Sequence, residues 1–122
     1  MGLIRSRDTK PELFVRSLVH GMGYRYRLHG ENLPGRPDLV FRGRMRVIFV
    51  HGCLWHLHRN CPRCRPPKSR RSYWMPKLLR NAERDKQVRR KLRSLGWRSL
   101  VIWECELRDG IKLAKRIRQF LS

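Results

Sequence analysis

Apolar and polar positions follow a helical period near the start of the chain. Thr9-Lys10-Pro11-Glu12 has the form of a capping box with proline inside the first turn, which predicts that a helix begins there. Gly21 and Gly23 are plausible stops for this helix. The apolar positions recur at about 3.6 residues per turn and predict an inward face; they are Leu13, Phe14, Leu18 and Met22.

The period then changes to two, which is typical of strands. Residues 24–28 alternate apolar side chains with arginine, as a half-buried strand does. The apolar runs 38–41 and 45–50 flank Arg42-Gly43-Arg44 and predict a tight hairpin between central strands. Residues 97–103 predict a further strand.

The remaining segments complete an α/β pattern. Residues 51–71 show no period and hold three of the cysteines, which indicates a functional loop held by metal. Residues 109–121 predict a last amphipathic helix, and residues 75–95 a basic one that stops at Gly96. The predicted inner face of the basic helix is Leu78, Leu79, Ala82, Val88, Leu92 and Leu95. This order predicts one α/β domain over residues 1–122, with a mixed β-sheet flanked by helices.

Charge narrows the class of partner. Lys and Arg number 30 against 9 Asp and Glu, giving a formal net charge of +21, so we expect a polyanion as partner. Nucleic acid fits, because cations that neutralise phosphates release condensed counterions. A membrane fits poorly, because no apolar run approaches the ~20 residues needed to span a bilayer. Residues 1–7 lack the apolar core of a secretory signal, so we expect a reducing cytoplasm in which cysteines bind metal.

Cysteine and histidine spacing predicts a zinc site. Cys53, His58, Cys61 and Cys64 lie close together in sequence, and Cys105 lies far downstream. Zinc takes four such ligands in a tetrahedron, so five candidates leave the set open, and free buried thiols are the alternative. The local four are the simplest set, whereas a set with Cys105 would close a longer loop and stabilise more.

An aspartate and a histidine stand at neighbouring strand ends. Asp38 begins one strand of the predicted hairpin and His51 ends the other, so we expect the two to meet at one edge of the sheet. This arrangement suits phosphodiester hydrolysis, in which a carboxylate fixes Mg²⁺ and an imidazole takes a proton from water. His56 is near enough in sequence to share that role. On spacing alone, Asp38 as a turn cap and the histidines as surface groups or zinc ligands remain alternatives.

Four more residues have a structural and a functional interpretation. Glu12 is the reciprocal partner in a capping box, or a site acid. Asp85 is a solvated helix acid, or a site acid. Trp55 and Trp74 are core residues, or aromatic wedges beside the basic loop that unstack a base pair. Trp97 and Trp103 lie within a strand pattern and are expected in the core.

Five sequence blocks resemble the very short patch repair (Vsr) endonucleases, in order and spacing, over nearly the whole chain. They are Ser6-Arg7-Asp8-Thr9-Lys10-Pro11-Glu12, Leu33-Pro34-Gly35-Arg36-Pro37-Asp38, Val47-Ile48-Phe49-Val50-His51-Gly52-Cys53-Leu54-Trp55-His56, Asn81-Ala82-Glu83-Arg84-Asp85 and Trp103-Glu104-Cys105-Glu106-Leu107. The resemblance implies a restriction-endonuclease-like α/β core with a structural zinc. It also implies Mg²⁺-dependent nicking of double-stranded DNA, 5′ of the thymine in a T:G mismatch.

The resemblance also implies roles by position. Asp38 and the backbone carbonyl of Val50 would bind Mg²⁺, and His56 would be the general base, supported by His51, Glu12 and Asp85. The implied zinc ligands are Cys53, His58, Cys61 and Cys105. The implied DNA contacts are Leu54, Trp55, Trp74, Arg36 and Asn81, and mismatch-repair proteins are candidate partners.

Three departures and two rival functions accompany the resemblance. Leu54 stands where an aromatic wedge is common, Cys64 is an extra thiol, and the segment before Arg7 is short, so a reduced grip on DNA is expected. The rivals are a non-catalytic, zinc-stapled DNA-binding module and a related nicking endonuclease with another target. The presence of Asp38, His51 and His56 favours an enzyme over a pure binder.

Overall fold

A four-stranded mixed sheet forms the centre of the molecule. The computed structural model describes residues 9–62, 64 and 68–122. The strands lie in the order β1-β2-β3-β4, with antiparallel pairing of the first three and parallel pairing of β3 with β4. They are β1 (Arg27–Leu28), β2 (Leu39–Phe41), β3 (Arg46–His51) and β4 (Arg98–Trp103).

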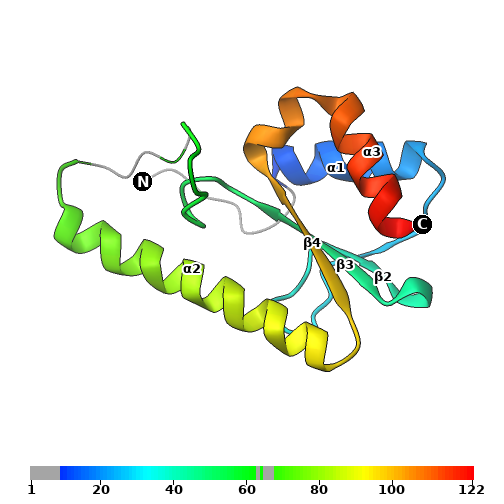
Figure 1. Cartoon of the computed structure of the whole chain (residues 1–122), viewed down its shortest axis with the longest axis horizontal. Helices are drawn as coiled ribbons and strands as arrows, with labels where there is room; N and C mark the ends of the chain where they lie inside the picture. Colours follow the sequence, from blue (N-terminus) through cyan, green and yellow to red (C-terminus); the bar gives the residue numbers. More distant parts are fainter. Residues whose placement is uncertain (1–8, 63, 65–67) are drawn as a thin grey trace.

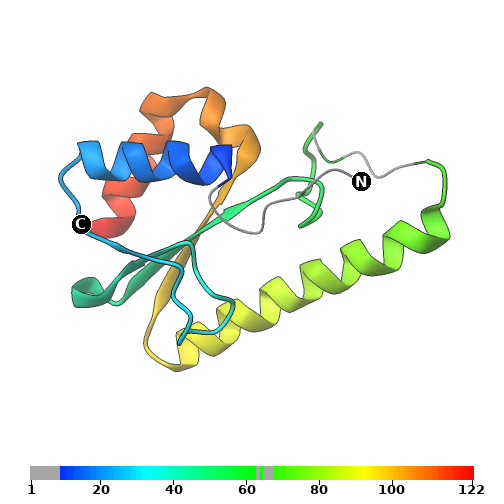
Figure 2. The same cartoon turned by 180° about the vertical axis from the view of Figure 1, so that it is seen from behind.

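Helices cover both faces of this sheet. Helices α1 (Lys10–Gly21) and α3 (Gly110–Leu121) lie on one face and α2 (Arg71–Ser94) on the other (Figures 1 and 2). Each face has its own apolar core: Ile48 packs toward α1 and α3, and Val47 packs toward α2. Successive strand residues point to opposite faces, which explains the continuous apolar runs within β2, β3 and β4. The predicted mixed sheet flanked by helices is confirmed.

Helix α1 begins as predicted but presents a different face. The Thr9 side chain accepts a hydrogen bond from the Glu12 amide at 3.4 Å and caps the helix. Val15 and Val19 form the buried face, whereas Leu13 and Phe14 are 47% and 43% exposed. The predicted face was therefore wrong for Leu13 and Phe14, because a helix with apolar residues on two sides does not reveal from sequence which side is covered.

Helix α2 is longer than predicted and only partly covered. It starts at Arg71, and its N-terminal part extends beyond the strands (Figure 1). Leu78 and Leu92 are buried, but Leu79 and Leu95 are more than half exposed, so these two members of the predicted inner face were wrong. The sheet is shorter than this helix and cannot cover its whole length.

The connections also differ from the sequence prediction. Only Arg27–Leu28 of the expected strand 24–28 pairs with β2. A 3₁₀ helix, η1 (Arg42–Arg44), followed by left-handed Met45, replaces the expected tight hairpin turn. A second one, η2 (Glu104–Arg108), follows β4. The described residues between β3 and α2 form turns without helix or strand, as predicted.

Strand register brings three chain segments to one end of the sheet. His51 at the end of β3 pairs with Trp103 at the end of β4, and Asp38 directly precedes the antiparallel β2. The predicted pairing of β2 with β3 is confirmed.

Within the described ranges, no helix is both long and apolar enough to cross a bilayer. The expectation about a secretory signal concerns residues outside these ranges.

Candidate functional site

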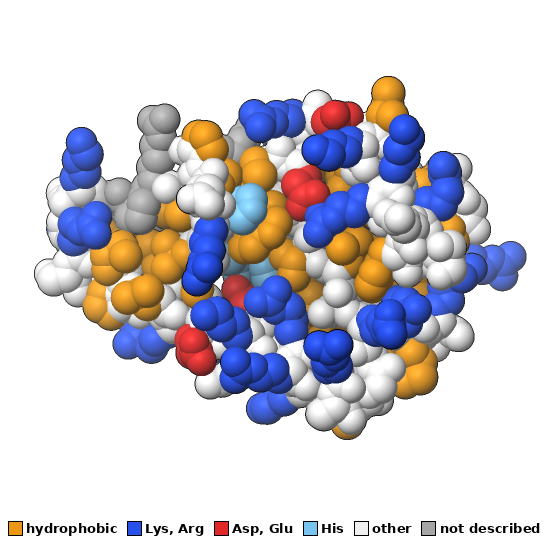
Figure 3. All heavy atoms as spheres, viewed as in Figure 1, with side chains coloured by type: hydrophobic (Ala, Val, Ile, Leu, Met, Phe, Trp, Pro, Cys, Tyr) orange, Lys and Arg blue, Asp and Glu red, His pale blue; other side chains and the backbone are white. Residues whose placement is uncertain are grey.

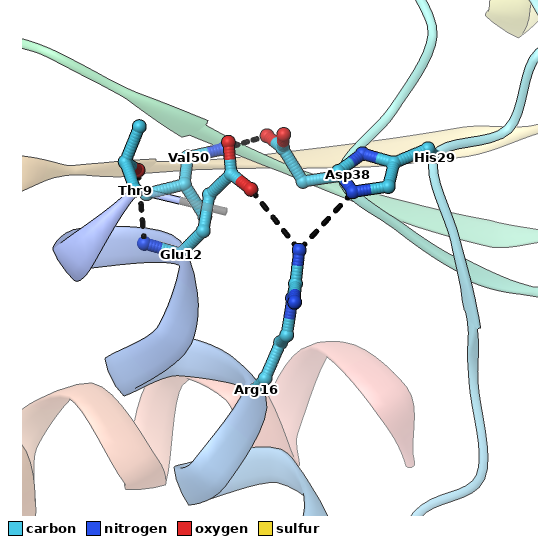
Figure 4. Close-up of polar contacts among 6 residues, drawn as sticks. All are labelled: Thr9, Glu12, Arg16, His29, Asp38 and Val50. Carbon is cyan, nitrogen blue, oxygen red and sulfur yellow. Dashed lines mark hydrogen bonds and ion pairs between the residues drawn. The ribbon is translucent and has the colours of Figure 1, made fainter. Parts of the chain in front are cut away.

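Three donor side chains from separate elements form what we call the acid group. They are Glu12 in the first turn of α1, His29 after β1 and Asp38 before β2, and their candidate ligand atoms lie within 4.8 Å of one another. The Val50 amide donates a 2.6 Å hydrogen bond to Asp38 Oδ2 (Figure 4). Glu12 is only 4% exposed. Two carboxylates thus face each other at the end of β3.

The electrostatics of this group favour a bound cation. Burial raises the pKa of Asp38 to about 7, the Val50 amide opposes the rise, and the Glu12 carboxylate adds to it. Two close carboxylates repel each other when both are ionised, and a divalent cation removes that repulsion. Carboxylate and carbonyl oxygens are the ligands that Mg²⁺ prefers, so the Asp38 and Glu12 oxygens and the carbonyl of Val50 fit this ion.

Sequence reasoning missed one member of the acid group, His29, and a neighbour that contacts it, Arg16. Arg16 Nη2 lies 3.2 Å from Glu12 Oε2 and 3.1 Å from His29 Nε2 (Figure 4). Guanidinium is only a donor, so His29 Nε2 is the acceptor in this pair. The four-residue spacing of Glu12 and Arg16 was an available signal. Nothing in the sequence links His29 to them, because only the tertiary fold brings it to α1.

A second set, the histidine group, lies in a hollow beside α2. The rings of His51 and His56 stack at 3.7 Å with 5° between their planes, and His56 Nδ1 lies 2.5 Å from Asp85 Oδ2. The hollow has a volume of about 530 Å³, and Lys86 and Arg89 also line it. Burial, and to a smaller extent the neighbouring His56, lower the pKa of His51 to about 3, so His51 is neutral near pH 7.

The acid and histidine groups are neighbours, not one cluster. Val50 contacts Asp38 through its amide, and His51 is the next residue, so both groups lie at the same end of the sheet. The start of β2 and the end of β3 lie at the same edge of the sheet, as predicted. Asp38 and His51, however, belong to separate sets of three donors. Asp85 is not the solvated helix acid of the structural interpretation, because its carboxylate contacts His56.

The structure brings together four of the five candidate zinc ligands. Cys53, His58, Cys61 and Cys105 place their donor atoms within 4.8 Å of one another, and Cys64 is not in this set. The His58 ring stacks on Trp103 at 4.0 Å. Three thiols and one imidazole fit a tetrahedral zinc ion. Burial raises the pKa of Cys53 to about 12, so a cation is needed to hold its thiolate form.

Four of the five expected DNA contacts lie on or beside the N-terminal half of α2, and Arg36 lies apart from them. The rings of Trp55 and Trp74 meet edge to face at 6.0 Å, and Asn81 Nδ2 donates to the Trp55 carbonyl at 3.4 Å. Leu54 is partly exposed beside them. Arg36 is exposed in the turn before β2, with a left-handed φ of 47°.

The four tryptophans divide into two pairs, of which the sequence predicted only the core pair. Trp97 and Trp103 pack against the core under α2, as expected. Trp55 and Trp74 are half-buried and belong to neither core cluster.

Lys and Arg side chains spread over the molecular face on which histidines are also visible (Figure 3). Hydrophobic and acidic side chains are also visible there, so a polyanion on this face would meet them together with the imidazole groups.

Comparisons with known proteins identify the family. The model of the family described as DNA mismatch endonuclease Vsr matches residues 1–63. The chain is 50% identical to the type II nicking enzyme V.XorIIP of Xanthomonas oryzae pv. oryzae over 122 residues, covering 100% of this chain and 89% of the relative. It is 43% identical to the DNA mismatch endonuclease Vsr of Escherichia coli over 113 residues, covering 93% and 72% respectively. The chain therefore belongs to the Vsr family of DNA mismatch endonucleases.

Proposed function

We propose that this chain is a Mg²⁺-dependent endonuclease that nicks one strand of double-stranded DNA, 5′ of the thymine in a T:G mismatch. One observation carries the proposal: the acid group and the histidine group lie side by side at one end of the sheet. Val50 contacts Asp38 of the first group, and the next residue, His51, belongs to the second. Family membership and the net charge of +21 support DNA as the substrate. The mixed sheet agrees with the restriction-endonuclease-like core of the family.

The acid group is the proposed magnesium site. Asp38 and the Val50 carbonyl would bind the ion, and Glu12 supports the site with a second carboxylate. When bound, Mg²⁺ would neutralise charge on the scissile phosphate. The Val50 amide fixes Asp38, and Arg16 fixes Glu12, so both carboxylates are oriented before the substrate binds.

The histidine group is the proposed proton acceptor. Asp85 holds His56 through Nδ1, which leaves Nε2 to take a proton from the attacking water. The new bond joins the water oxygen to phosphorus, and the bond from phosphorus to the leaving oxygen breaks. Neutral His51 stacks against His56 and supports the ring without competing for the proton.

Zinc is proposed as a structural cofactor, held by Cys53, His58, Cys61 and Cys105. These ligands join the loop after β3 to the residue that follows β4. His56 lies between two of the ligands in sequence, so the same ion would fix the position of the proton acceptor. Zinc thiolates require reduced cysteines, so we place the protein in the cytoplasm.

We assign mismatch recognition to the paired rings of Trp55 and Trp74, which we call the aromatic cluster, and to their neighbours. We propose that Trp55, Trp74 and Leu54 pack against or enter the mismatched step, and that Arg36 and Asn81 hold the flanking DNA. Apolar wedges of this kind separate stacked bases. The relatives named type II nicking enzymes favour one second candidate, which is the same chemistry at a different target.

A nicking assay on matched duplexes tests the proposal. Duplexes that differ only in a T:G or a T:A pair are incubated with Mg²⁺ or with EDTA. We expect a nick 5′ of the mismatched thymine with Mg²⁺ only, and a loss of at least ~100-fold for Asp38→Ala, because a ligand of the ion is removed. Asp109→Ala, which alters an exposed acid that caps α3, is the matched control and should still nick.

Each other outcome of this assay has a defined meaning. Equal nicking by Asp38→Ala would remove the catalytic assignment. Mismatch-independent nicking would favour the second candidate, and binding without nicking would favour the zinc-stapled binding module. Mismatch-repair proteins are the proposed partners, and adding them to the same reaction should raise the nicking rate.

A further inference from the structure

A second hollow lies outside the proposed catalytic groups. It has a volume of about 820 Å³ and lies between the C-terminal half of α2, the first residues of β3 and β4, and the end of α3. No Asp or Glu is among the described residues that line it. The cations that line it, which we call the basic groove, are Arg46, Lys86, Arg89, Arg90, Arg93 and Arg98.

The basic groove has a defined floor and one fixed cation. Strand β4 pairs only with β3 among the described strands, so its other side is a sheet edge, and Arg98 and Ser99 on β4 line the groove. Arg46 donates from Nε to the Phe120 carbonyl at 3.3 Å, and its guanidinium lies 5.7 Å from the Phe120 ring. This side chain is therefore oriented before any ligand arrives.

Structural roles explain some of these charges but not their number. Cations near the C-terminus of α2 interact favourably with the helix dipole, and a charged side chain on an edge strand prevents pairing with another chain. One or two residues would serve both purposes. Six like charges around one hollow repel one another, and this cost indicates an anionic ligand.

The basic groove is continuous with the histidine group. Lys86 and Arg89 line both hollows, so a polyanion can pass from one to the other without leaving basic surface. Arg46 and His51 are the two ends of β3, which places them about 17 Å apart at ~3.3 Å per strand residue. That length equals about five steps of a DNA strand at ~3.4 Å each.

We propose that the basic groove binds the phosphate backbone of duplex DNA on one side of the nick, about five base pairs away. The position of the nick rests on the proposed function, whereas the contact with DNA does not. These contacts read no base sequence, because they reach phosphates only. They would hold the duplex while the mismatch is tested, and so offset the small area of the aromatic cluster.

Salt dependence of binding tests the contact without any catalysis. The affinity for a fully paired duplex is measured in EDTA at several NaCl concentrations. Arg93→Ala with Arg98→Ala should weaken binding about tenfold and lower the slope of log affinity against log salt by about two, since two phosphate contacts are lost. Arg25→Ala with Arg27→Ala removes the same charge from exposed positions near the opposite edge strand, β1, and should leave the slope nearly unchanged.

The results separate this proposal from the proposed function. Equal loss of slope in both double variants would overturn the groove, because net charge alone would then explain binding. Arg90→Gln with Arg93→Gln is a second pair for the same measurement and should also lose slope. If the wild-type chain never nicks DNA but the slopes differ as expected, the groove stands and the proposed catalysis fails.

Duplex length tests the location. With a T:G mismatch and Mg²⁺, shortening the DNA on one side of the nick to fewer than about five base pairs should reduce nicking by the wild type about tenfold. The Arg93→Ala, Arg98→Ala variant should respond less to this shortening. Equal sensitivity of both proteins would place the contact elsewhere and contradict the proposal.

Discussion

The Asp38 carboxylate accepts a hydrogen bond from the Val50 amide and lies beside Glu12, so its charge is stabilised on one side and opposed on the other. Functional residues often carry such a conflict, because the charge that binds a cation is costly without one. The Glu12 pair with Arg16 relieves part of the cost. The Asp38 and Glu12 carboxylates are thus arranged to fit the divalent cation that we propose.

Asp38→Asn should separate stability from activity. The amide keeps an acceptor for Val50 and removes a partly buried charge, so in EDTA we expect an equal or higher Tm. A gain on the order of 1 kcal/mol would correspond to about 4 °C in a chain of this size. Nicking should fall at least ~100-fold. Thermal denaturation and the nicking assay measure the two effects, and a clearly lower Tm would contradict this view of the site.

Arg16→Gln should destabilise the fold. The substitution leaves Glu12 and Asp38 close together without the cation, so we expect a loss of about 1–3 kcal/mol in the free energy of unfolding. Urea denaturation in EDTA measures it. Arg25→Gln alters an exposed arginine and should change little. Similar losses in the two variants would show that Arg16 does not stabilise the acid group.

At the scale of elements, the turn before β2 packs against α2. Gly35 has φ +76°, and a Cβ there would lie 2.4 Å from Val88 Cγ1. Gly35→Ala should therefore cost about 1–3 kcal/mol of stability through both strain and overlap. Gly43→Ala in η1 meets open space and is the matched control. Urea denaturation compares them, and a neutral Gly35→Ala would contradict the close packing.

The proposed zinc site joins two segments that are distant in sequence, the loop after β3 and the first residues of η2. Cys105→Ser should lose bound zinc and lower the Tm, because it removes one of the four convergent donors. Cys64→Ser alters the thiol outside that set, and this variant should keep its zinc and its Tm. Metal analysis of the purified variants together with thermal denaturation decides between the two cysteines. Zinc loss from the Cys64 variant alone would restore the local ligand set.

At the scale of the whole molecule, charge opposes folding and favours binding. Self-repulsion at +21 should be screened by salt, so the Tm of the free protein should rise between about 0.05 and 0.5 M NaCl. The affinity for DNA should fall over the same range. Thermal denaturation and binding titrations check the opposite signs. A Tm that does not respond to salt would indicate that the charges are too well separated to repel.

Sequence patterns were most informative where local chemistry decides the outcome. The starts of α1 and α3, the strand periods and the hairpin order come from capping and side-chain alternation within short segments. They were sufficient to predict the mixed sheet and to place Asp38 and His51 at one end of it. They failed for Leu13 and Leu79, because apolar periodicity shows that a helix has an apolar side but not how far its neighbours reach.

The sequence by itself determined the kinds of element, the donor types and the excess of positive charge, because these depend on residues that are close together or on composition. Only the tertiary structure decided which donors meet. It placed Cys105 with Cys53 in preference to Cys64, brought His29 to Arg16, and joined α2, β4 and α3 around the basic groove. Such choices depend on closing long loops around a core, and no local pattern encodes that closure.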